Sequence, residues 1–549
     1  MRRFSWAAAA VAVLVSGAAA VRADNPPVAA RVDVVFARWS ADTPGCAVGV
    51  DDGHDVLRRA YGSADLEHGV ANGPDTVFEA GSVSKQFTAA AVLLLGQAGK
   101  LSVDDPVRKY VPELPDYGVP LTIRHMLHHT SGLRDWGTVV EAAGWPRGTR
   151  AHTHAHVLDV VSRQKALNFP PGREYLYSNT NYNLLAIIVE RVSGRSFAQY
   201  TREAIFEPLA MTRTGWRDDY TRIVKDRAVA YERRPDGYHL SMPFENVHGN
   251  GGLLTTVSDL LRWNENFASG KVGGRALADE LQRRGRLDSG REIAYARGLV
   301  VSDFRGVPEV AHSGATAGYR AFLARYPGSR LSVAVLCNSA EADAPALAHD
   351  VAGVYLGSAF APRPAPTPAP VPAAALDERA GLYRNLRTGE ALRLTRHEGT
   401  LRLEGRGDLV PLSETLFTLG EGGPRLRFAA TGGARGFDLL TPDGDTLRCA
   451  AAEEFRPSAA DLNLYEGTYV SDEAEVAYTM KVENGSLVAF RRPDARFVLA
   501  PAYRDAFTAT YPPLVLFLRD DQGAVTGLSL GLGRVRDLRF RRAPAAPGR

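Results

Sequence analysis

A uniformly apolar stretch at residues 89–95 begins four positions after Lys85, in a segment that opens with Gly81-Ser82-Val83-Ser84-Lys85. A globular protein tolerates a helix that is apolar on every side only where that helix runs through its core. Gly99, with Lys100 after it, is a typical stop signal. The pattern therefore predicts a buried helix that opens close to Ser82 and Lys85.

Shorter apolar runs in the first 360 residues predict a mixed α+β fold. Runs at 44–50 and 56–61 indicate two strands joined by a turn, and runs at 320–326 and 331–337 indicate two more. Helices are predicted within 121–133, capped by Thr122, and from about residue 184. A hairpin followed by the buried helix near Ser82 is the first sign of this mixed domain.

The pattern changes beyond Gly357, because a Pro- and Ala-rich stretch at 361–372 is followed only by β-type alternation. This β region repeats itself. Gly381-Leu382-Tyr383 recurs 86 residues later as Gly467-Thr468-Tyr469, and the pair Pro411 and Phe417 recurs 90 residues later as Pro501 and Phe507. Two copies of one small antiparallel module are predicted after an extended linker.

Composition narrows the setting. The 549 residues carry 23% charged side chains and a net charge of +3, which indicates neither nucleic acid nor an anionic membrane surface as a partner. A basic start, an apolar run and small residues up to about Ala23 are typical of a signal peptide, so export to the periplasm or beyond a bacterial cell is expected, with no membrane span. Three cysteines without metal-ligand spacing allow at most one internal disulfide.

Candidate chemistry begins with Ser82 and Lys85. A spacing of three places both side chains on one face of a helix, and a buried lysine loses its charge readily, so the amine can activate the hydroxyl. Tyr177 and Asn179 lie where a Pro- and Gly-rich loop meets a helix, and they are either a proton-transfer phenol and a substrate-binding amide or a core aromatic and a helix cap. Small residues around His312 let a backbone approach a ligand closely.

Other histidines are interpreted as non-catalytic. His128 and His129 lie in a predicted scaffold helix. His152, His154 and His156 alternate at the start of another helix, which puts them on different faces, so surface positions are predicted for them. No metal and no cofactor are expected.

The motifs Gly81-Ser82-Val83-Ser84-Lys85, Tyr177-Ser178-Asn179 and His312-Ser313-Gly314, in this order, resemble those of the serine β-lactamase and penicillin-binding-protein superfamily. The class C, esterase and D-aminopeptidase branch is most similar. The resemblance implies an α+β β-lactamase-like domain at 24–360, with an antiparallel sheet flanked by helices and an all-helical subdomain. A signal peptide at 1–23, a linker at 361–375 and two lipocalin-like β-barrels at 376–457 and 458–545 complete the expected layout.

The resemblance also implies roles. Ser82 would attack a carbonyl, Lys85 and Tyr177 would share the proton transfer, and the backbone N–H groups of Ser82 and Ala315 would form the oxyanion hole. Asn179, Gly314 and Ala315 would bind substrate, and His312 would assist Tyr177 or contact the substrate. The strands that hold Cys46 and Cys337 would be neighbours, so the two residues form either a disulfide or a pair of buried thiols.

The expected activity is hydrolysis of an amide or ester in a small molecule or short peptide through a Ser82 acyl-enzyme, of the D-aminopeptidase, esterase or D-Ala-D-Ala-peptidase type. Where class C β-lactamases carry Lys-Thr-Gly this chain has His-Ser-Gly, which favours substrates that lack a carboxylate at this subsite. The alternatives are a penicillin-binding or cell-wall-sensing protein with little turnover, and a true β-lactamase. The oligomeric state is left open.

Overall fold

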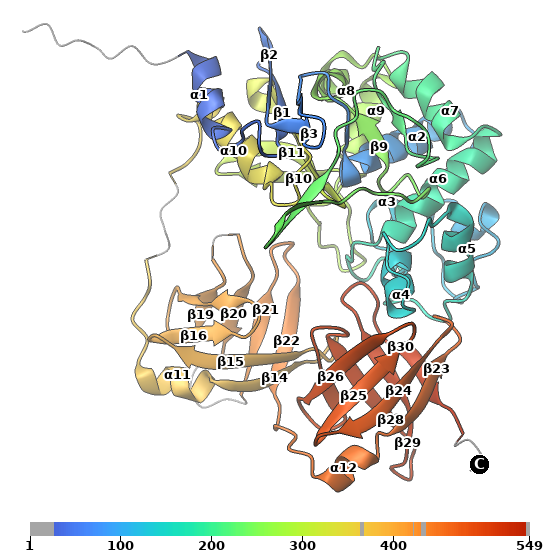
Figure 1. Cartoon of the computed structure of the whole chain (residues 1–549), viewed down its shortest axis with the longest axis vertical. Helices are drawn as coiled ribbons and strands as arrows, with labels where there is room; N and C mark the ends of the chain where they lie inside the picture. Colours follow the sequence, from blue (N-terminus) through green and yellow to red (C-terminus); the bar gives the residue numbers. More distant parts are fainter. Residues whose placement is uncertain (1–26, 363–366, 421, 430–434, 545–549) are drawn as a thin grey trace, which may run out of the picture.

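The computed structural model describes residues 27–362, 367–420, 422–429 and 435–544 (Figure 1). The predicted signal peptide at 1–23 lies outside the described residues. Within the described ranges, no helix combines the length and apolar character needed to cross a bilayer.

A six-stranded antiparallel sheet organises the first part of the chain, in the order β10-β11-β12-β13-β1-β2. Its strands are β1 (Cys46–Asp51), β2 (Val56–Tyr61), β10 (Val300–Phe304), β11 (Val307–Thr316), β12 (Tyr319–Tyr326) and β13 (Leu331–Cys337). All four predicted strands are present. β13 is buried at every position, which requires cover on both faces of the sheet.

Helices supply that cover. On one face, Val48 and Val50 pack in a cluster with α1 (Val28–Val35) and α10 (Ala344–Leu356). On the other face, a side chain at Gly49 would meet Val257 and Leu261 of α8 (Val257–Ser269), which is followed by α9 (Gly274–Leu281). The alternation of β1 thus buries both of its faces.

A disulfide joins the neighbouring strands β13 and β1 of the sheet. Cys46 and Cys337 are directly paired across β1 and β13, with 4.0 Å between their Cα atoms, and the structure forms the bond. The remaining cysteine, Cys449, is free and buried.

The helical subdomain is inserted between β2 and β10, and the predicted core helix is its centre. The elements are α2 (Lys85–Gln97), α3 (Ile123–Leu127), α4 (Trp136–Ala142), α5 (His154–Ser162), α6 (Asn179–Ser193) and α7 (Phe197–Thr201). α2 is buried at every residue from Lys85 to Leu93, as predicted, and packs on α6. Thr122 caps α3 as predicted, but that helix already ends at Leu127 because His129 takes a positive φ of 57°.

Short strands complete this region. They are β3 (Ser63–Asp65), β4 (Val70–Ala71), β5 (Phe78–Glu79), β6 (Gly215–Trp216), β7 (Tyr231–Arg234), β8 (Gly237–Leu240) and β9 (Leu253–Thr255). β9 lies between β5 and β6 in a three-stranded sheet, so it directly supports the turn that follows β5 and carries Ser82.

The prediction of surface histidines at the start of α5 is wrong. His152 is only 1% exposed and its Nε2 lies 3.2 Å from the carbonyl of Trp145. His154 is half-buried. The reason is a long-range contact: the loop before β9 crosses the chain just before the first residue of α5, where Asn246 N donates to His152 O (2.8 Å).

The C-terminal part forms two β-barrels, one nearly closed and one closed. After α11 (Ala373–Arg379), nine strands run in the order β17-β16-β15-β14-β22-β21-β20-β19-β18. The two edge strands β17 (Gly407–Asp408) and β18 (Val410–Pro411) are separated by one residue, so the sheet curls back on itself. The other strands are β14 (Gly381–Asn385), β15 (Ala391–His397), β16 (Thr400–Leu403), β19 (Leu416–Thr418), β20 (Arg425–Phe428), β21 (Gly436–Leu440) and β22 (Thr446–Ala451).

The second barrel follows α12 (Ala459–Asn463) and closes through pairing of β23 with β30. Its strands are β23 (Gly467–Ser471), β24 (Val476–Glu483), β25 (Ser486–Arg491), β26 (Ala495–Pro501), β27 (Ala506–Thr508), β28 (Leu514–Arg519), β29 (Val525–Gly531) and β30 (Leu538–Arg542).

The predicted repeat is confirmed in detail. Pro411 pairs with Phe417, and Pro501 pairs with Phe507. Tyr383 and Tyr469, at equivalent places in β14 and β23, each donate a hydrogen bond to the carbonyl four residues earlier, at 2.7 and 2.9 Å. Two modules with the same strand pairs and the same tyrosine contact share one fold.

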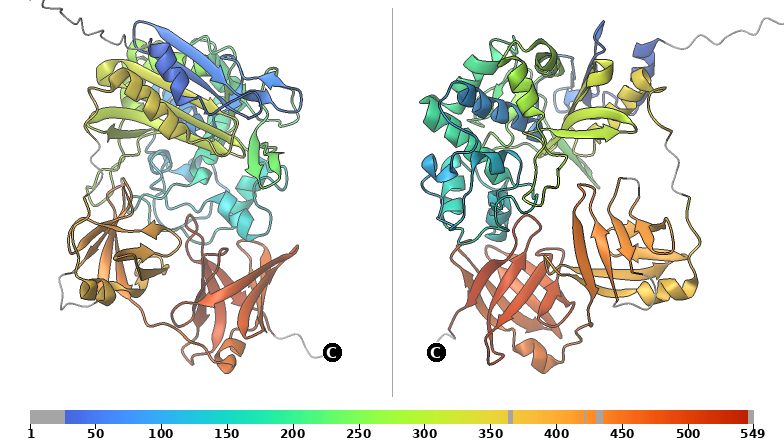
Figure 2. Two further views of the ribbon diagram at one scale, coloured as in Figure 1. Left: turned by 60° about the vertical axis from the view of Figure 1, so that its left-hand side comes forward. Right: turned by 180° about the vertical axis from the view of Figure 1, so that it is seen from behind.

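The second barrel lies directly against α4, below it in Figure 1, and the view from behind in Figure 2 shows the same contact. A buried ion pair of Arg134 and Glu473 forms part of this contact, with 2.6 Å between Nη1 and Oε2 and both side chains at most 7% exposed. Lys165 N also donates to Glu473 (2.7 Å), and Tyr478 donates to Ala142 O (3.0 Å). Removal of one partner from a buried ion pair is strongly destabilising, so this pair ties the second barrel to the helical subdomain.

Candidate active site

Ser82 and Lys85 are brought together at the start of the core helix. Ser82 lies in the 3-10 turn η1 (Gly81–Ser84), and Lys85 is the first residue of α2, with 3.0 Å between Nζ and Oγ. Nζ also donates to Asn179 Oδ1 (3.1 Å) and to Asn250 O (2.6 Å). Both oxygens can only accept, whereas the Ser82 hydroxyl can also donate. A neutral amine therefore fits: two N–H groups bind the two carbonyls, and its lone pair faces the serine.

The surroundings of Lys85 favour that neutral form. The side chain is fully buried, and burial lowers the pKa of Lys85 well below its usual value; the charges of Arg534 and Arg147 lower it further, against a small opposing effect of Asp135. A buried lysine with a lowered pKa is suited to accept the proton of a nucleophilic hydroxyl.

Tyr177 and Asn179 face the same amine. Lys85 Nζ lies 4.7 Å from the centre of the Tyr177 ring. Burial raises the pKa of Tyr177, and contact with Ser82 and the charge of Arg534 oppose that rise. Asn179 is the first residue of α6 and its side chain binds Lys85, whereas the cap position belongs to Ser178, so the helix-cap alternative for Asn179 is wrong.

An unpaired strand edge passes the serine turn. β10 pairs with β11 only as far as Ala311, and no strand among the described residues covers that edge from His312 to Thr316. A Cβ on Gly314 would lie 2.0 Å from Ala80 O and 3.1 Å from Ser82 N. A Cβ on Gly81, which has a φ of +50°, would lie 2.6 Å from Ala315 N. Only glycines permit this approach, which brings the backbone of the serine turn close to that of β11 at Gly314 and Ala315.

His312 is held by its neighbours. Its Nδ1 lies 2.6 Å from Ser313 O, and its Nε2 lies 3.1 Å from the hydroxyl of Tyr295. Burial, with the nearby charge of Lys85, lowers the pKa of His312 to about 4. The neutral ring donates from Nδ1 and accepts the Tyr295 proton. The centre of the His312 ring lies 6.4 Å from that of the Tyr177 ring. His312 therefore lines the cavity and is not a direct hydrogen-bond partner of Tyr177.

Sequence reasoning missed several residues of the site. His129, interpreted as scaffold, lies under Tyr177 with 4.2 Å between the rings, and its Nδ1 lies within 3.2 Å of Ser178 N and within 3.0 Å of Asn181 Nδ2. Tyr295 and Asn250 were not considered. The adjacent histidines His128 and His129 were a visible signal for His129, but Tyr295 and Asn250 stand in no motif.

The largest omission is Arg534, which comes from the second barrel. The turn between β29 and β30 reaches the helical subdomain, where Asn168 Nδ2 donates to Arg534 O (2.9 Å). The guanidinium of Arg534 lies 5.0 Å from the centre of the Tyr177 ring. Glu174, three residues before Tyr177, accepts from Arg387 of the first barrel (3.1 Å) and from Arg536 of the second (2.9 Å). Both barrels therefore hold the Tyr177 segment.

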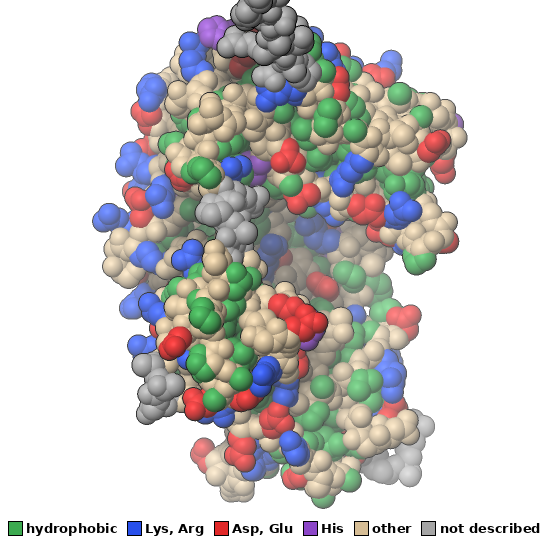
Figure 3. All heavy atoms as spheres, turned by 90° about the vertical axis from the view of Figure 1, so that its left-hand side faces the viewer, with side chains coloured by type: hydrophobic (Ala, Val, Ile, Leu, Met, Phe, Trp, Pro, Cys, Tyr) green, Lys and Arg blue, Asp and Glu red, His purple; other side chains and the backbone are tan. Residues whose placement is uncertain are grey.

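A cavity of about 640 Å³ lies at the site, and Ser82, His312 and Arg534 are among the residues that line it. Ser82, Tyr177 and Asn179 meet there with the β11 edge. Charged side chains from several elements surround them: Arg147, Arg320, Arg534, Glu341 and Asp343. Figure 3 shows a hollow between the upper part of the molecule and the barrels, with basic side chains in its wall.

Substitution of Arg534 by alanine is expected to shift the acid limb of the kcat/KM profile to higher pH. The positive charge of Arg534 lowers the pKa of Lys85, so its removal raises that pKa, and the active neutral amine is lost at a higher pH as the solution is acidified. Arg534→Lys, which keeps the charge, should shift the limb less, and Arg539→Ala, at an exposed site of the same barrel, should not shift it. An unchanged limb in Arg534→Ala would exclude this coupling.

Comparison with known proteins assigns the family. The beta-lactamase family profile matches residues 28–356. The chain belongs to the beta-lactamase family. Its sheet, its helical subdomain and the pairing of Ser82 with Lys85 all lie within the matched residues.

Individual relatives extend the match into the barrels. A D-aminopeptidase of Brucella anthropi is 28% identical over 91% of this chain and 95% of its own length. Penicillin-binding protein 4* of Bacillus subtilis is 29% identical over 68% of this chain and 87% of its own length. The octameric penicillin-binding protein homologue from Pyrococcus abyssi has a TM-score of 0.53 and 21% identity, and covers 86% of this chain and 99% of its own; at that identity it shows the fold. The protein is a serine hydrolase of this family.

Proposed function

We propose that this beta-lactamase family member is an exported hydrolase of the D-aminopeptidase or esterase type, which cleaves amides or esters through an acyl-enzyme on Ser82. The contact of Ser82 Oγ with the buried amine of Lys85, at 3.0 Å, carries the proposal. Lys85 takes the serine proton as the neutral base, and Tyr177, whose pKa is raised, holds its proton for the leaving group. The N–H groups of Ser82 and Ala315 bind the oxyanion.

The charges around the cavity support a short substrate with an amino group. Glu341 and Asp343, just before and at the cap of α10, offer carboxylates to an ammonium, and His312 is neutral at the position where related hydrolases carry a lysine. Arg147 and Arg534, which were not foreseen from the sequence, also line the cavity, so avoidance of carboxylates is expected at the His312 subsite and not throughout the cavity. Relatives called D-aminopeptidase over 91% of the chain agree with this class.

Export is supported by the disulfide between Cys46 and Cys337, since such bonds persist in oxidising compartments. It also agrees with the apolar N-terminal run in the sequence.

Purified full-length protein should hydrolyse D-amino-acid p-nitroanilides and short-chain esters faster than a chromogenic cephalosporin. The L-enantiomers and the N-acetylated D-compounds are the matched controls. A preference for the free amine of about tenfold or more is expected, the value of one charge-assisted hydrogen bond, and it should fall in Glu341→Gln. A cephalosporin hydrolysed as fast as the amides would overturn the substrate assignment.

The second candidate, a penicillin-binding protein with little turnover, is favoured by the relative from Bacillus subtilis. It predicts one burst of product per enzyme and no steady state. Steady release from a D-amino-acid amide excludes it.

A further inference from the structure

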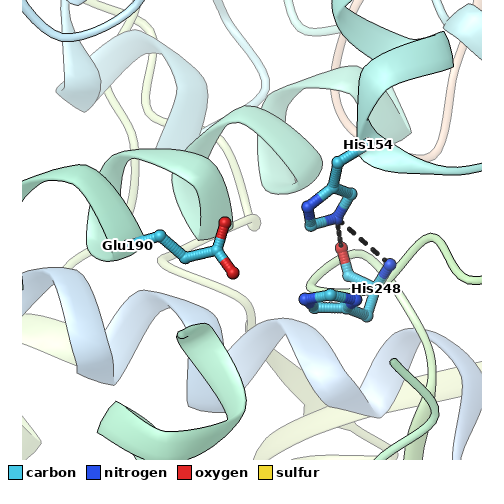
Figure 4. Close-up of side chains that lie close together, drawn as sticks. All are labelled: His154, Glu190 and His248. Carbon is cyan, nitrogen blue, oxygen red and sulfur yellow. Dashed lines mark hydrogen bonds between the residues drawn. The ribbon is translucent and has the colours of Figure 1, made fainter. Parts of the chain in front are cut away.

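A cluster of metal-ligand side chains lies outside the active site. His154 begins α5, Glu190 is on α6 and His248 is in the loop before β9, and their ligand atoms all lie within 4.8 Å of one another (Figure 4). We propose that these three residues bind a divalent metal ion, in the combination of two imidazoles and one carboxylate that suits Zn²⁺. No metal was expected from the sequence, because the three residues come from separate segments and show no metal-ligand spacing.

The two histidines are oriented as metal ligands are. His154 Nε2 lies 3.1 Å from His248 O, and His248 Nδ1 lies 3.2 Å from Asn246 O. An N–H at each of these atoms donates to the carbonyl and leaves a lone pair on the other nitrogen of each ring. Metal-binding histidines in proteins are fixed in this way, by one ring N–H donated to a carbonyl. His154 Nε2 can instead accept from the backbone N–H of His248, 3.3 Å away, when the ring proton is on Nδ1. Metal binding would favour the other tautomer, in which Nε2 carries the proton and Nδ1 binds the ion.

The free nitrogen of His248 has no other use in the structure. The residue is only 7% exposed, and its Nε2 is buried without a hydrogen-bond partner among the described residues. A buried polar atom in that state is unfavourable unless an ion or water satisfies it. The cluster supplies the remaining ligand, because Glu190 Oε1 accepts from Phe197 N (3.1 Å), which orients the carboxylate, and Oε2 has no hydrogen bond among the described residues.

Aromatic side chains enclose the cluster of His154, Glu190 and His248. The rings of His154 and His248 lie against each other with 4.2 Å between their centres and a tilt of 39°. The ring centres of Phe197 and Trp216 lie 5.7 and 6.3 Å from that of His248. An apolar shell of this kind limits water around a bound ion. Two residues further along the loop, Asn250 O accepts from Lys85, so the ion would tie down the loop that positions the catalytic amine.

The test uses tag-free full-length protein, stripped of metal with a chelator and titrated with zinc by calorimetry. We expect one zinc per chain, a higher Tm with zinc, and weakening of binding in His248→Gln beyond the roughly 10- to 100-fold that an outer-shell change costs. The exposed group Asp65, Glu67 and His68 is the matched control, and His68→Gln should bind zinc as the wild type does.

Glu190→Gln serves as the second variant if His248→Gln does not fold, because the glutamine oxygen can still accept from Phe197 N. It should also lose zinc. Cobalt bound to the wild type should give the visible spectrum of a tetrahedral ion, absent from both variants. Wild type without zinc affinity, or zinc binding that both variants retain and His68→Gln loses, would overturn the proposal.

Discussion

Ser82→Ala should abolish covalent labelling by a fluorophosphonate and reduce kcat on the best substrate by about 10⁴- to 10⁶-fold, the range found when a nucleophilic serine is removed. Among the residues that the structure describes, this hydroxyl is the only side-chain oxygen that contacts Lys85 Nζ and can donate a proton to it. Loss of one hydroxyl in a half-buried turn should leave the fold intact, since its removal creates no large cavity.

Labelling is measured by mass spectrometry of proteolytic peptides, and folding by circular dichroism and Tm. Ser84, two residues away, donates to Gly81 O (2.6 Å) and is occupied with the turn itself. Ser313 lies on the β11 edge of the cavity. A label that moves to either residue in the variant, with hydrolysis preserved, would show that Ser82 is not the nucleophile.

Substitution of Lys85 should have the second-largest effect, a loss of about 10²- to 10⁴-fold in kcat/KM, as expected for a general base. Two variants separate the possible roles. Lys85→Met fills the buried space without an amine, and Lys85→Arg keeps a charge that is not titrated near neutral pH. If the neutral amine accepts the serine proton, both variants lose activity to a similar degree.

The measurement is the pH profile of kcat/KM, together with the rate of fluorophosphonate labelling. Both variants should lack the acid limb that the wild type owes to Lys85. Retention of activity in Lys85→Arg, with loss only in Lys85→Met, would mean that a positive charge rather than a base is needed at this position. That outcome would transfer the role of base to Tyr177.

The sequence was sufficient for the parts of the fold that depend on local pattern. The helix after Lys85 is apolar on all sides and is buried, and the strands at 44–50, 56–61, 320–326 and 331–337 form the sheet. The barrel repeat was visible because its structural positions, such as Tyr383 and Tyr469, are tied to hydrogen bonds made within each module.

The site was predictable where its residues stand in short motifs, as Ser82, Tyr177, Asn179 and His312 do. Ser82 and Lys85 lie three positions apart, and the chain holds them in contact. Asn250 and Arg534 reach the cavity, and Tyr295 reaches His312 behind it, through contacts between distant segments, and a single polar residue in a loop carries no local pattern that marks it. The surface assignment of His152 failed for the same reason, since the loop that covers it lies nearly a hundred positions away.

The turn that carries Arg534 belongs to a barrel whose own stability rests on its strands and its inner core. Turns between strands tolerate changes of sequence and length that strands do not. Arg534, at the exposed tip of this turn, can therefore vary while the Ser82 turn and the sheet stay unchanged, whereas Leu532 and Val535 are buried in the core. In this architecture a change in one barrel turn can alter both the wall of the substrate cavity and the charge beside the catalytic amine, while the residues that break the bond stay the same.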